Sequence, residues 1–465
     1  MRILFTTLQF KESEFYGRVA AELRSRGHDA AHVAFSRHAA GGLRRQSFRA
    51  WCLADALAEL PKLSPAEIEH EADRIVDRYD TPTLRDIYRT DWPCDGMSEA
   101  QSVERTVRHF LALERVFDEW QPDVLVPELG SETMRTAAHL IAKERGIGTL
   151  YLFYTPFPRP VRLYWDSLHA PIVPLDEVRG LEPAERAEVE AFIDRFTAER
   201  KPIRRHRKAR VTSATLRDFT RHMAVRATQD RDNEYLRPGR FVTNLVRERA
   251  RAVAARPRYG ALEPGRPFVY FPLHVVDDYK VKRVIPHCYD QASLIERVAE
   301  ALPHGHDLVL KEHPMSIGRN RLSLLRRLAR VENVRIVSPH ENSHELIQRA
   351  EAVAVISSTV GLEALFYGRP VLTLGQPYYS GYGVTLDVDS FREIREAVPA
   401  LLAYRPDRER ILEFLHAAMR SCQPGKPMLV DAPDLSEQNV RALAATIDAA
   451  MQERASGERE LVAPD

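Results

Sequence analysis

Short apolar segments, each followed by small or polar residues, recur in both halves of the chain. In the first half they cover residues 2–7, 31–35, 121–127 and 149–154. In the second half they cover residues 268–274, 306–314, 353–357 and 370–375. Helical patterns at 14–26 and 134–145 separate the early segments. Continuous apolar runs are typical of parallel strands buried on both faces. The pattern predicts an α/β protein with two Rossmann-like halves, although the dinucleotide motif Gly-x-Gly-x-x-Gly is absent.

Two long stretches with charged helical patterns predict helical insertions in the first half. A segment rich in proline and glycine follows them, which is typical of a linker. The last helices, at 407–421 and 435–454, are expected to pack back across the first domain. The expected domains are an N-terminal domain over 1–256 with insertions at about 40–120 and 181–256, a linker over 257–267, a C-terminal domain over 268–430, and a terminal helix with a disordered tail over 431–465.

Composition narrows the class of protein. A chain of 465 residues is long for one core, which favours two domains. Its 67 basic and 66 acidic residues nearly cancel, so no global field favours nucleic acid. The four cysteines form no Cys-x-x-Cys pair, so neither zinc nor a disulfide framework is indicated and a reducing cytoplasm is expected. No apolar run approaches the roughly 18 residues of a membrane span, and the first run is too short for a signal peptide.

One basic stretch departs from this balance. Seven of the eleven residues from Arg200 to Arg210 are lysine or arginine. A solvated helical face would explain the stretch. It would equally suit a polyanionic glycan or an anionic membrane surface, where each basic residue contributes about 1 kcal/mol. Peripheral attachment at the inner membrane is therefore one expected localisation.

Hydroxylated residues follow the segment at 353–357 and precede a helical pattern. Ser357, Ser358 and Thr359 would aim backbone N–H groups, hydroxyls and the positive end of that helix at one point, which suits a phosphate. The alternative is an ordinary helix cap. The neighbouring segments also end in polar residues, and the carboxyl ends of parallel strands share one edge of a sheet. We therefore expect an anion site there that includes Lys311 and His313, with His274 beside it as a candidate contact to the nucleotide or its ribose.

Carboxylates supply the other candidate chemistry. Glu128 follows the segment at 121–127 and is the candidate general base, with a capping or solvated glutamate as the alternative. Glu363, one turn into the helix after Thr359, could accept hydrogen bonds from a ribose. Arg159 and Asp166 belong to a rigid, aromatic and basic loop that either contacts a sugar or anionic acceptor or is only a proline-rich connection.

No metal site is expected. Asp387-Val388-Asp389 matches the Asp-x-Asp motif of metal-dependent transferases literally. It lies beyond the last predicted strand, however, and is interpreted as a solvated loop.

Several motifs stand in a characteristic order: Phe271-Pro272-Leu273-His274, Lys311-Glu312-His313-Pro314, Ile356-Ser357-Ser358-Thr359-Val360-Gly361-Leu362-Glu363-Ala364 and Gly368-Arg369-Pro370-Val371. In order and spacing they resemble the capsule polysaccharide biosynthesis family, which includes bacterial transferases of 3-deoxy-manno-octulosonic acid (Kdo). The resemblance is densest over residues 268–380. It implies a GT-B glycosyltransferase: two Rossmann-like domains facing across a cleft, metal-independent chemistry, and a nucleotide sugar held mainly by the C-terminal half.

The resemblance also implies roles for particular residues. His313-Pro314 and Ser357-Ser358-Thr359 would hold the donor phosphate, with His313 assisting catalysis. Glu128 with Gly130 is the nearest match to an acidic residue before a glycine in the N-terminal half. The implied partners are a nucleotide sugar, with CMP-Kdo as one candidate, and a glycan or glycolipid acceptor, and no further cofactor is implied.

Three functions remain open at this point. The first is a glycosyltransferase of capsule or surface polysaccharide synthesis. The second is a GT-B-like sugar-nucleotide epimerase or a polyol-phosphate transferase, and an epimerase would need no acceptor. The third is a non-catalytic assembly protein that binds glycan or nucleotide.

Overall fold

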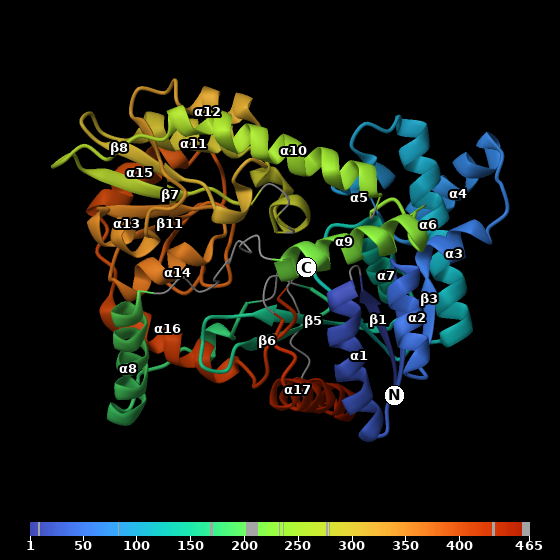
Figure 1. Cartoon of the computed structure of the whole chain (residues 1–465). Helices are drawn as coiled ribbons and strands as arrows, with labels where there is room; N and C mark the ends of the chain where they lie inside the picture. Colours follow the sequence, from blue (N-terminus) through green and yellow to red (C-terminus); the bar gives the residue numbers. More distant parts are fainter. Residues whose placement is uncertain are drawn as a thin grey trace. The chain divides into compact units, whose positions relative to one another are not determined.

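The structure, a computed structural model, divides the chain into two compact units. Unit 1 comprises residues 1–170, 208–242 and 422–465, and unit 2 comprises 171–207 and 243–421. Within the described residues each unit has a six-stranded sheet, which confirms the predicted α/β class with two Rossmann-like parts (Figure 1). The structure describes residues 1–7, 10–81, 83–167, 171–200, 213–231, 233–235, 237–275, 278, 280–429 and 433–457.

The sheet of unit 1 has the strand order β3-β2-β1-β4-β5-β6, which is that of a Rossmann fold. Every neighbouring pair is parallel except β5 and β6. The order reverses between β1 and β4, so their carboxyl ends flank the crevice where such sheets bind ligands. The strands are β1 (Arg2–Thr7), β2 (Asp29–Ala34), β3 (Arg49–Cys52), β4 (Val124–Pro127), β5 (Gly148–Tyr154) and β6 (Val161–Trp165).

Two of these strands were not predicted from the sequence. Strand β3 lies inside the expected helical insertion at 40–120, and β6 lies inside the expected loop. Both are edge strands, with exposed or half-buried residues among the buried ones. Neither therefore shows the continuous apolar run of an interior strand.

Helices cover both faces of this sheet. Because side chains alternate along a strand, Ile3 and Phe5 of β1 face one layer and Leu4 faces the other. The first layer contains α1 (Phe10–Ser25), α2 (Arg37–Arg45) and α17 (Glu437–Ser456). The second contains α3 (Leu53–Ala58), α4 (Pro65–Arg78), α5 (Leu84–Tyr88), α6 (Glu99–Trp120) and α7 (Thr133–Glu144).

The C-terminal helix returns to unit 1, as predicted. Helix α17 packs beside α1, at the opposite end of the chain (Figure 1). Helix α9 (Ser213–Thr228) also belongs to this unit. The predicted tail at 458–465 and most of the basic stretch, residues 201–210, lie outside the described residues.

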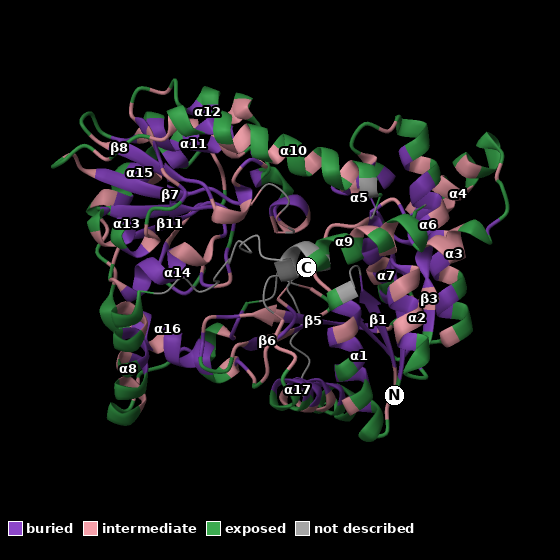
Figure 2. Cartoon of the chain, viewed as in Figure 1, coloured by how far each residue is buried: buried purple, intermediate pink, exposed green. Residues whose placement is uncertain are grey.

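The sheet of unit 2 has the order β12-β11-β10-β7-β8-β9, and all its strand pairs are parallel. Here the order reverses between β7 and β10. Buried residues concentrate in both sheets and on the helix faces that pack against them (Figure 2). The strands are β7 (Phe268–Pro272), β8 (Asp307–Lys311), β9 (Val334–Val337), β10 (Ala352–Val355), β11 (Val371–Thr373) and β12 (Leu386–Asp387).

Helices again form two layers. Helices α11 (Gln291–Ala301), α12 (Leu322–Leu328) and α15 (Ile394–Ala403) share a core with one face of the sheet, and α13 (Ser343–Arg349) and α14 (Thr359–Phe366) lie on the other (Figure 1). Helix α10 (Pro238–Ala255) joins that core through Ala255. Short turns occur at Trp92–Cys94, Leu175–Glu177, Arg256–Arg258, Lys280–Val284, Pro286–Cys288 and Pro314–Ser316.

Three sequence expectations differ from this arrangement. Helix α16 (Arg408–Ser421) packs against α8 (Pro183–Glu199) within unit 2, so the prediction that it crosses the first domain is wrong. The expected linker at 257–267 lies inside unit 2, where Tyr259 packs against the core. Asp387 is not a solvated loop residue, because its carboxylate accepts hydrogen bonds from the hydroxyls of Thr373 and Thr385.

Candidate functional site

The predicted anion site lies where the sheet order of unit 2 reverses. Ser357 follows β10 and His274 follows β7, and the backbone N–H of Ser357 donates a hydrogen bond to Nε2 of His274 at 3.0 Å. Ser358 caps α14, accepting from the N–H of Val360 at 3.3 Å, and Thr359 is the first residue of that helix. The strand therefore leads into a helix whose positive N-terminal end lies at the carboxyl end of β10.

Two further contacts hold this junction in place. The hydroxyl of Tyr379 donates to the carbonyl of Ser358 at 2.5 Å. A Cβ on Gly361 would lie 2.1 Å from that hydroxyl oxygen, so only glycine lets Tyr379 cross the first turn of α14. Nζ of Lys280 lies 3.5 Å from the hydroxyl oxygen of Ser357 and adds a cation. The sequence placed Tyr379 past the end of the strand at 370–375 but gave it no role. It did not single out Lys280, although the cationic run Lys280-Val281-Lys282-Arg283 was a signal that could have done so.

The end of β8 contributes Lys311 and His313. The buried ammonium of Lys311 donates to the hydroxyl of Ser343 at 2.7 Å, and burial lowers its pKa. Nδ1 of His313 accepts from the N–H of Met315 at 3.2 Å, so the neutral ring carries its proton on Nε2, as a donor. Glu312 between them is fully buried and accepts from the amide of Asn320, so it serves the fold.

Glu363 is buried beneath the same edge. Its residue is 5% exposed, and burial raises the pKa of its carboxyl to about 8, against the opposing charge of Lys311. The contacts of the described residues include no hydrogen bond to this carboxyl group. The protein therefore leaves the hydrogen-bonding capacity of this carboxyl group unused, and the group can bind a hydroxyl of a ligand.

The candidate base lies at the corresponding point of unit 1. Glu128 follows β4, and its Oε2 accepts a 2.5 Å hydrogen bond from the hydroxyl of Tyr16 in α1. Burial and the neighbouring charge of Glu12 raise the pKa of Glu128 to about 7, while Arg135 and the Tyr16 hydrogen bond oppose the rise. Arg135 itself pairs with Glu12 at 3.1 Å and with Glu132 at 3.4 Å. A carboxyl group that titrates near neutrality suits a general base.

The two predicted acceptor contacts lie at opposite ends of strand β5 in the unit 1 sheet. Arg159 is exposed in the turn between β5 and β6, beside the carboxyl end of β5. Asp166 lies beside the start of β5, where it accepts from the N–H of Thr149 at 2.7 Å and pairs with Arg454 of α17 at 2.8 Å. Both carboxylate oxygens of Asp166 thus hold the fold, and it does not lie at the edge that carries Glu128.

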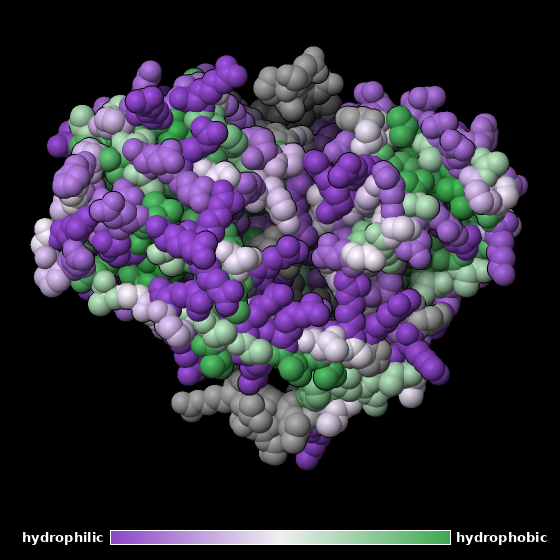
Figure 3. All heavy atoms as spheres, turned by 90° about the horizontal axis from the view of Figure 1, so that it is seen from above, coloured by the Kyte–Doolittle hydropathy of each residue, from purple (hydrophilic) through white to green (hydrophobic). Residues whose placement is uncertain are grey.

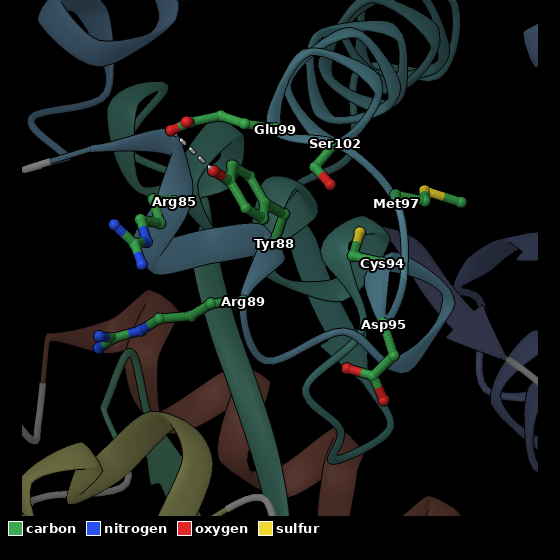
Figure 4. A pocket seen from close by; sticks show the side chains of 8 residues that line it. All are labelled: Arg85, Tyr88, Arg89, Cys94, Asp95, Met97, Glu99 and Ser102. Carbon is green, nitrogen blue, oxygen red and sulfur yellow. Dashed lines mark hydrogen bonds between the residues drawn. The ribbon is translucent and has the colours of Figure 1, made fainter.

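Unit 1 also has a pocket that sequence reasoning did not find. It has a volume of about 260 Å³ and lies among α5, the turn after it and the start of α6 (Figure 4). The hydroxyl of Tyr88 points towards Glu99 and donates to its Oε1 at 3.5 Å. It contains none of the predicted site residues, and its lining consists of Arg85, Tyr88, Arg89, Cys94, Asp95, Met97, Glu99 and Ser102.

The described residues contain no group of three or more His, Cys, Asp and Glu placed to hold a metal ion. In the same residues, no helix is both long and apolar enough to cross a membrane. Hydrophilic residues predominate on the face in Figure 3, with hydrophobic residues in small groups.

The structure thus gathers the predicted residues into two sets. Within unit 2, the ends of the adjacent strands β10, β7 and β8 carry the set Ser357, Ser358, Thr359, His274, Lys311 and His313, with Glu363 beneath. Within unit 1, Glu128 lies with Tyr16 and the Arg135 cluster.

Comparison with known proteins gives partial matches. Protein FixF of Sinorhizobium fredii is 32% identical over 157 residues, which cover 33% of this chain and 37% of that protein. The capsule polysaccharide modification protein LipA of Neisseria meningitidis serogroup B is 33% identical over 81 residues, or 17% of this chain and 12% of LipA. The chain spans less than half the length of these curated relatives. The solved structure of Thermosulfurimonas dismutans KpsC, a β-Kdo 2,7 transferase, aligns at 16% identity over 68% of this chain and 85% of that chain, with a TM-score of 0.32.

A family model matches a larger part of the chain than FixF or LipA does. The model of the capsule polysaccharide biosynthesis protein family matches residues 175–412, a little more than half of the 465 residues. The matched range contains all the predicted site residues of unit 2. The chain therefore belongs to the capsule polysaccharide biosynthesis protein family.

Proposed function

We propose that this protein is a GT-B glycosyltransferase of bacterial capsule synthesis that moves a sugar from a nucleotide donor to a glycan or glycolipid acceptor. The proposed donor is CMP-Kdo, in line with the family resemblance. Cationic side chains and a helix end, rather than a metal ion, balance the charge of the departing phosphate in this proposal.

The observation that carries the proposal is the junction between β10 and α14. A leaving CMP has a negative phosphate that must be stabilised as the glycosidic bond breaks. The N-terminus of α14, with Ser358 and Thr359, offers backbone N–H groups and hydroxyls for that charge. Lys280 and Lys311 add cations from neighbouring elements, and an arriving phosphate favours the charged form of Lys311.

The remaining groups have complementary roles. The donor Nε2–H of His313 would bind a phosphate oxygen. The carboxyl group of Glu363 would bind a ribose hydroxyl. Glu128 would take the proton of the acceptor hydroxyl as its oxygen attacks the anomeric carbon, and CMP would leave with the bonding electron pair.

A nucleotide panel tests the donor site. We would measure the melting temperature of the wild type with CMP, UDP, GDP, CDP and ADP, and repeat it for His313→Ala and Ser358→Ala. A ligand at 100 times its dissociation constant adds about 2.7 kcal/mol of stability, which such an assay resolves. The proposal predicts selective stabilisation by CMP that both variants lose. Stabilisation by UDP or GDP alone would show that the donor nucleotide is not CMP. No stabilisation by any nucleotide would contradict the proposal.

A second assay separates transfer from epimerisation. An epimerase converts the nucleotide sugar alone, whereas a transferase releases the free nucleotide at a rate that depends on the acceptor. We expect acceptor-dependent release of CMP that continues in EDTA. Release that stops in EDTA and returns with a divalent cation would contradict the metal-independent part of the proposal.

A further inference from the structure

The ring of His274 has both nitrogens directed at the protein. Nε2 accepts the N–H of Ser357 at 3.0 Å, and Nδ1 lies 3.4 Å from Oδ2 of Asp278. The backbone N–H of His274 donates to the side chain of Gln291 at 3.0 Å. The residue is only 7% exposed. A ring held in this way has no nitrogen left for the ribose contact that the sequence suggested.

Asp278 determines which nitrogen carries the proton. Because Nε2 is an acceptor, the neutral ring bears its proton on Nδ1, where it faces the carboxylate of Asp278. The other oxygen of Asp278 accepts from the N–H of Lys280 at 2.9 Å. Burial raises the pKa of Asp278, but the hydrogen bond and charge of His274, together with the backbone N–H and charge of Lys280, outweigh this effect and hold that pKa at about 2.

The ring also bridges the point where the strand order reverses. His274 belongs to the end of β7 and Ser357 to the end of β10, and these strands are neighbours in the sheet. Ser357 is followed at once by the cap and first residue of α14. Within the described residues, the charged groups at this point include Asp278 beside Nδ1 and Lys280, whose Nζ lies 3.5 Å from the Ser357 hydroxyl. A shift of the ring would therefore move the start of α14 relative to the β7 side of the site.

We infer that His274 is a positioning residue that, oriented by Asp278, holds the Ser357 backbone so that the start of α14 is preset for the donor phosphate. This inference rests on the proposed function only for the identity of the ligand. His274 acts through Ser357 and touches no part of the nucleotide.

The first experiment measures the junction without any ligand. Amide hydrogen exchange at Ser357 would be compared in the wild type, His274→Leu and His274→Gln, with melting curves to establish that each variant is folded. Leucine cannot accept the hydrogen bond, whereas the glutamine amide oxygen can replace Nε2. We expect exchange at least about tenfold faster in His274→Leu and close to wild type in His274→Gln. Unchanged exchange in His274→Leu would overturn the inference.

The second experiment separates positioning from ribose contact. Dissociation constants would be measured for CMP and for 2′,3′-dideoxy-CMP, which lacks both ribose hydroxyls. If His274 acts by positioning, His274→Leu weakens both ligands by the same factor, about tenfold. A loss confined to CMP would make His274 a ribose ligand and overturn the inference.

The variant Asp278→Leu tests the positioning role without altering the His274 ring itself. It leaves the imidazole in place but removes its orienting partner, so we expect a smaller loss that is again equal for the two nucleotides. Wild-type binding of Asp278→Leu would contradict the role given to Asp278. If the wild type binds no nucleotide, the proposed function fails, and the exchange experiment still decides the positioning role.

Discussion

The hydroxyl of Tyr16 donates a hydrogen bond to Oε2 of Glu128 at 2.5 Å, at the point where the strand order of unit 1 reverses. Tyr16 comes from α1 and Glu128 follows β4, so the contact joins elements that are more than 100 residues apart. Burial and Glu12 favour the protonated carboxyl, while this hydrogen bond favours the carboxylate. The balance leaves Glu128 titrating near neutrality, where a general base must work.

Tyr16→Phe should shift the pH dependence of transfer. Without the hydroxyl, the pKa of Glu128 rises further above about 7, so the base is ionised only at higher pH. We expect the acidic limb of kcat/KM to move up by about one to two pH units, since a hydrogen bond to a charged group contributes about 1.5–3 kcal/mol. The control is Tyr79→Phe, which removes a similar bond to Glu114 elsewhere in unit 1. An acidic limb unchanged in Tyr16→Phe would argue against Glu128 as the base.

Glu363→Gln should alter how stability depends on pH. The folded-state pKa of Glu363 is raised from 4.5 to about 8, so its contribution is present below the unfolded pKa and is lost as pH rises to about 8. The variant should lose less stability between pH 5 and pH 8, by up to a few kcal/mol. Urea unfolding at several pH values measures this. Glu345→Gln, an exposed residue of α13, is the control, and parallel curves for wild type and Glu363→Gln would refute the prediction.

Gly361→Ala should disturb the donor site through Tyr379. The added methyl group would lie 2.1 Å from the Tyr379 hydroxyl, which bonds to the carbonyl of Ser358. We expect a loss of roughly 1–3 kcal/mol in unfolding free energy and a weaker stabilisation by CMP. Removing the hydroxyl in Gly361→Ala/Tyr379→Phe should recover part of the stability. A double variant no more stable than Gly361→Ala would show that the clash lies elsewhere.

His32→Leu should make unit 1 more resistant to acid. His32 is fully buried in the sheet, its ring stacks on Phe5, and within the described residues neither ring nitrogen has a hydrogen-bond partner. Burial and Arg24 lower its pKa to about 3, so the wild type loses stability as pH falls from about 6.5 towards 3. The variant should remove up to about 1.4 kcal/mol per pH unit from this slope. The exposed His340→Gln is the control, and an equal acid midpoint in His32→Leu and wild type would contradict the prediction.

The sequence predicted the interior strands and the residues at their ends, because buried parallel strands are continuous apolar runs. This placed Lys311, His313 and Ser357 at one edge. It could not show that the ring of His274 is turned towards the protein, because that depends on a contact with Ser357, 83 residues away. The role of Asp166 was equally hidden, since its partner Arg454 lies 288 residues away and local patterns carry no such information.

The transfer reaction itself is measured as the release of CMP from CMP-Kdo by wild type and Glu128→Gln, with and without a capsule glycolipid acceptor. We expect acceptor-dependent release by the wild type and a rate at least about 100-fold lower in Glu128→Gln. The variant should keep its stabilisation by CMP, because Glu128 lies outside the donor site of unit 2. Release by Glu128→Gln at the wild-type rate would contradict the role of Glu128 as the base, and no release by the wild type with any acceptor would contradict the proposed transfer of Kdo.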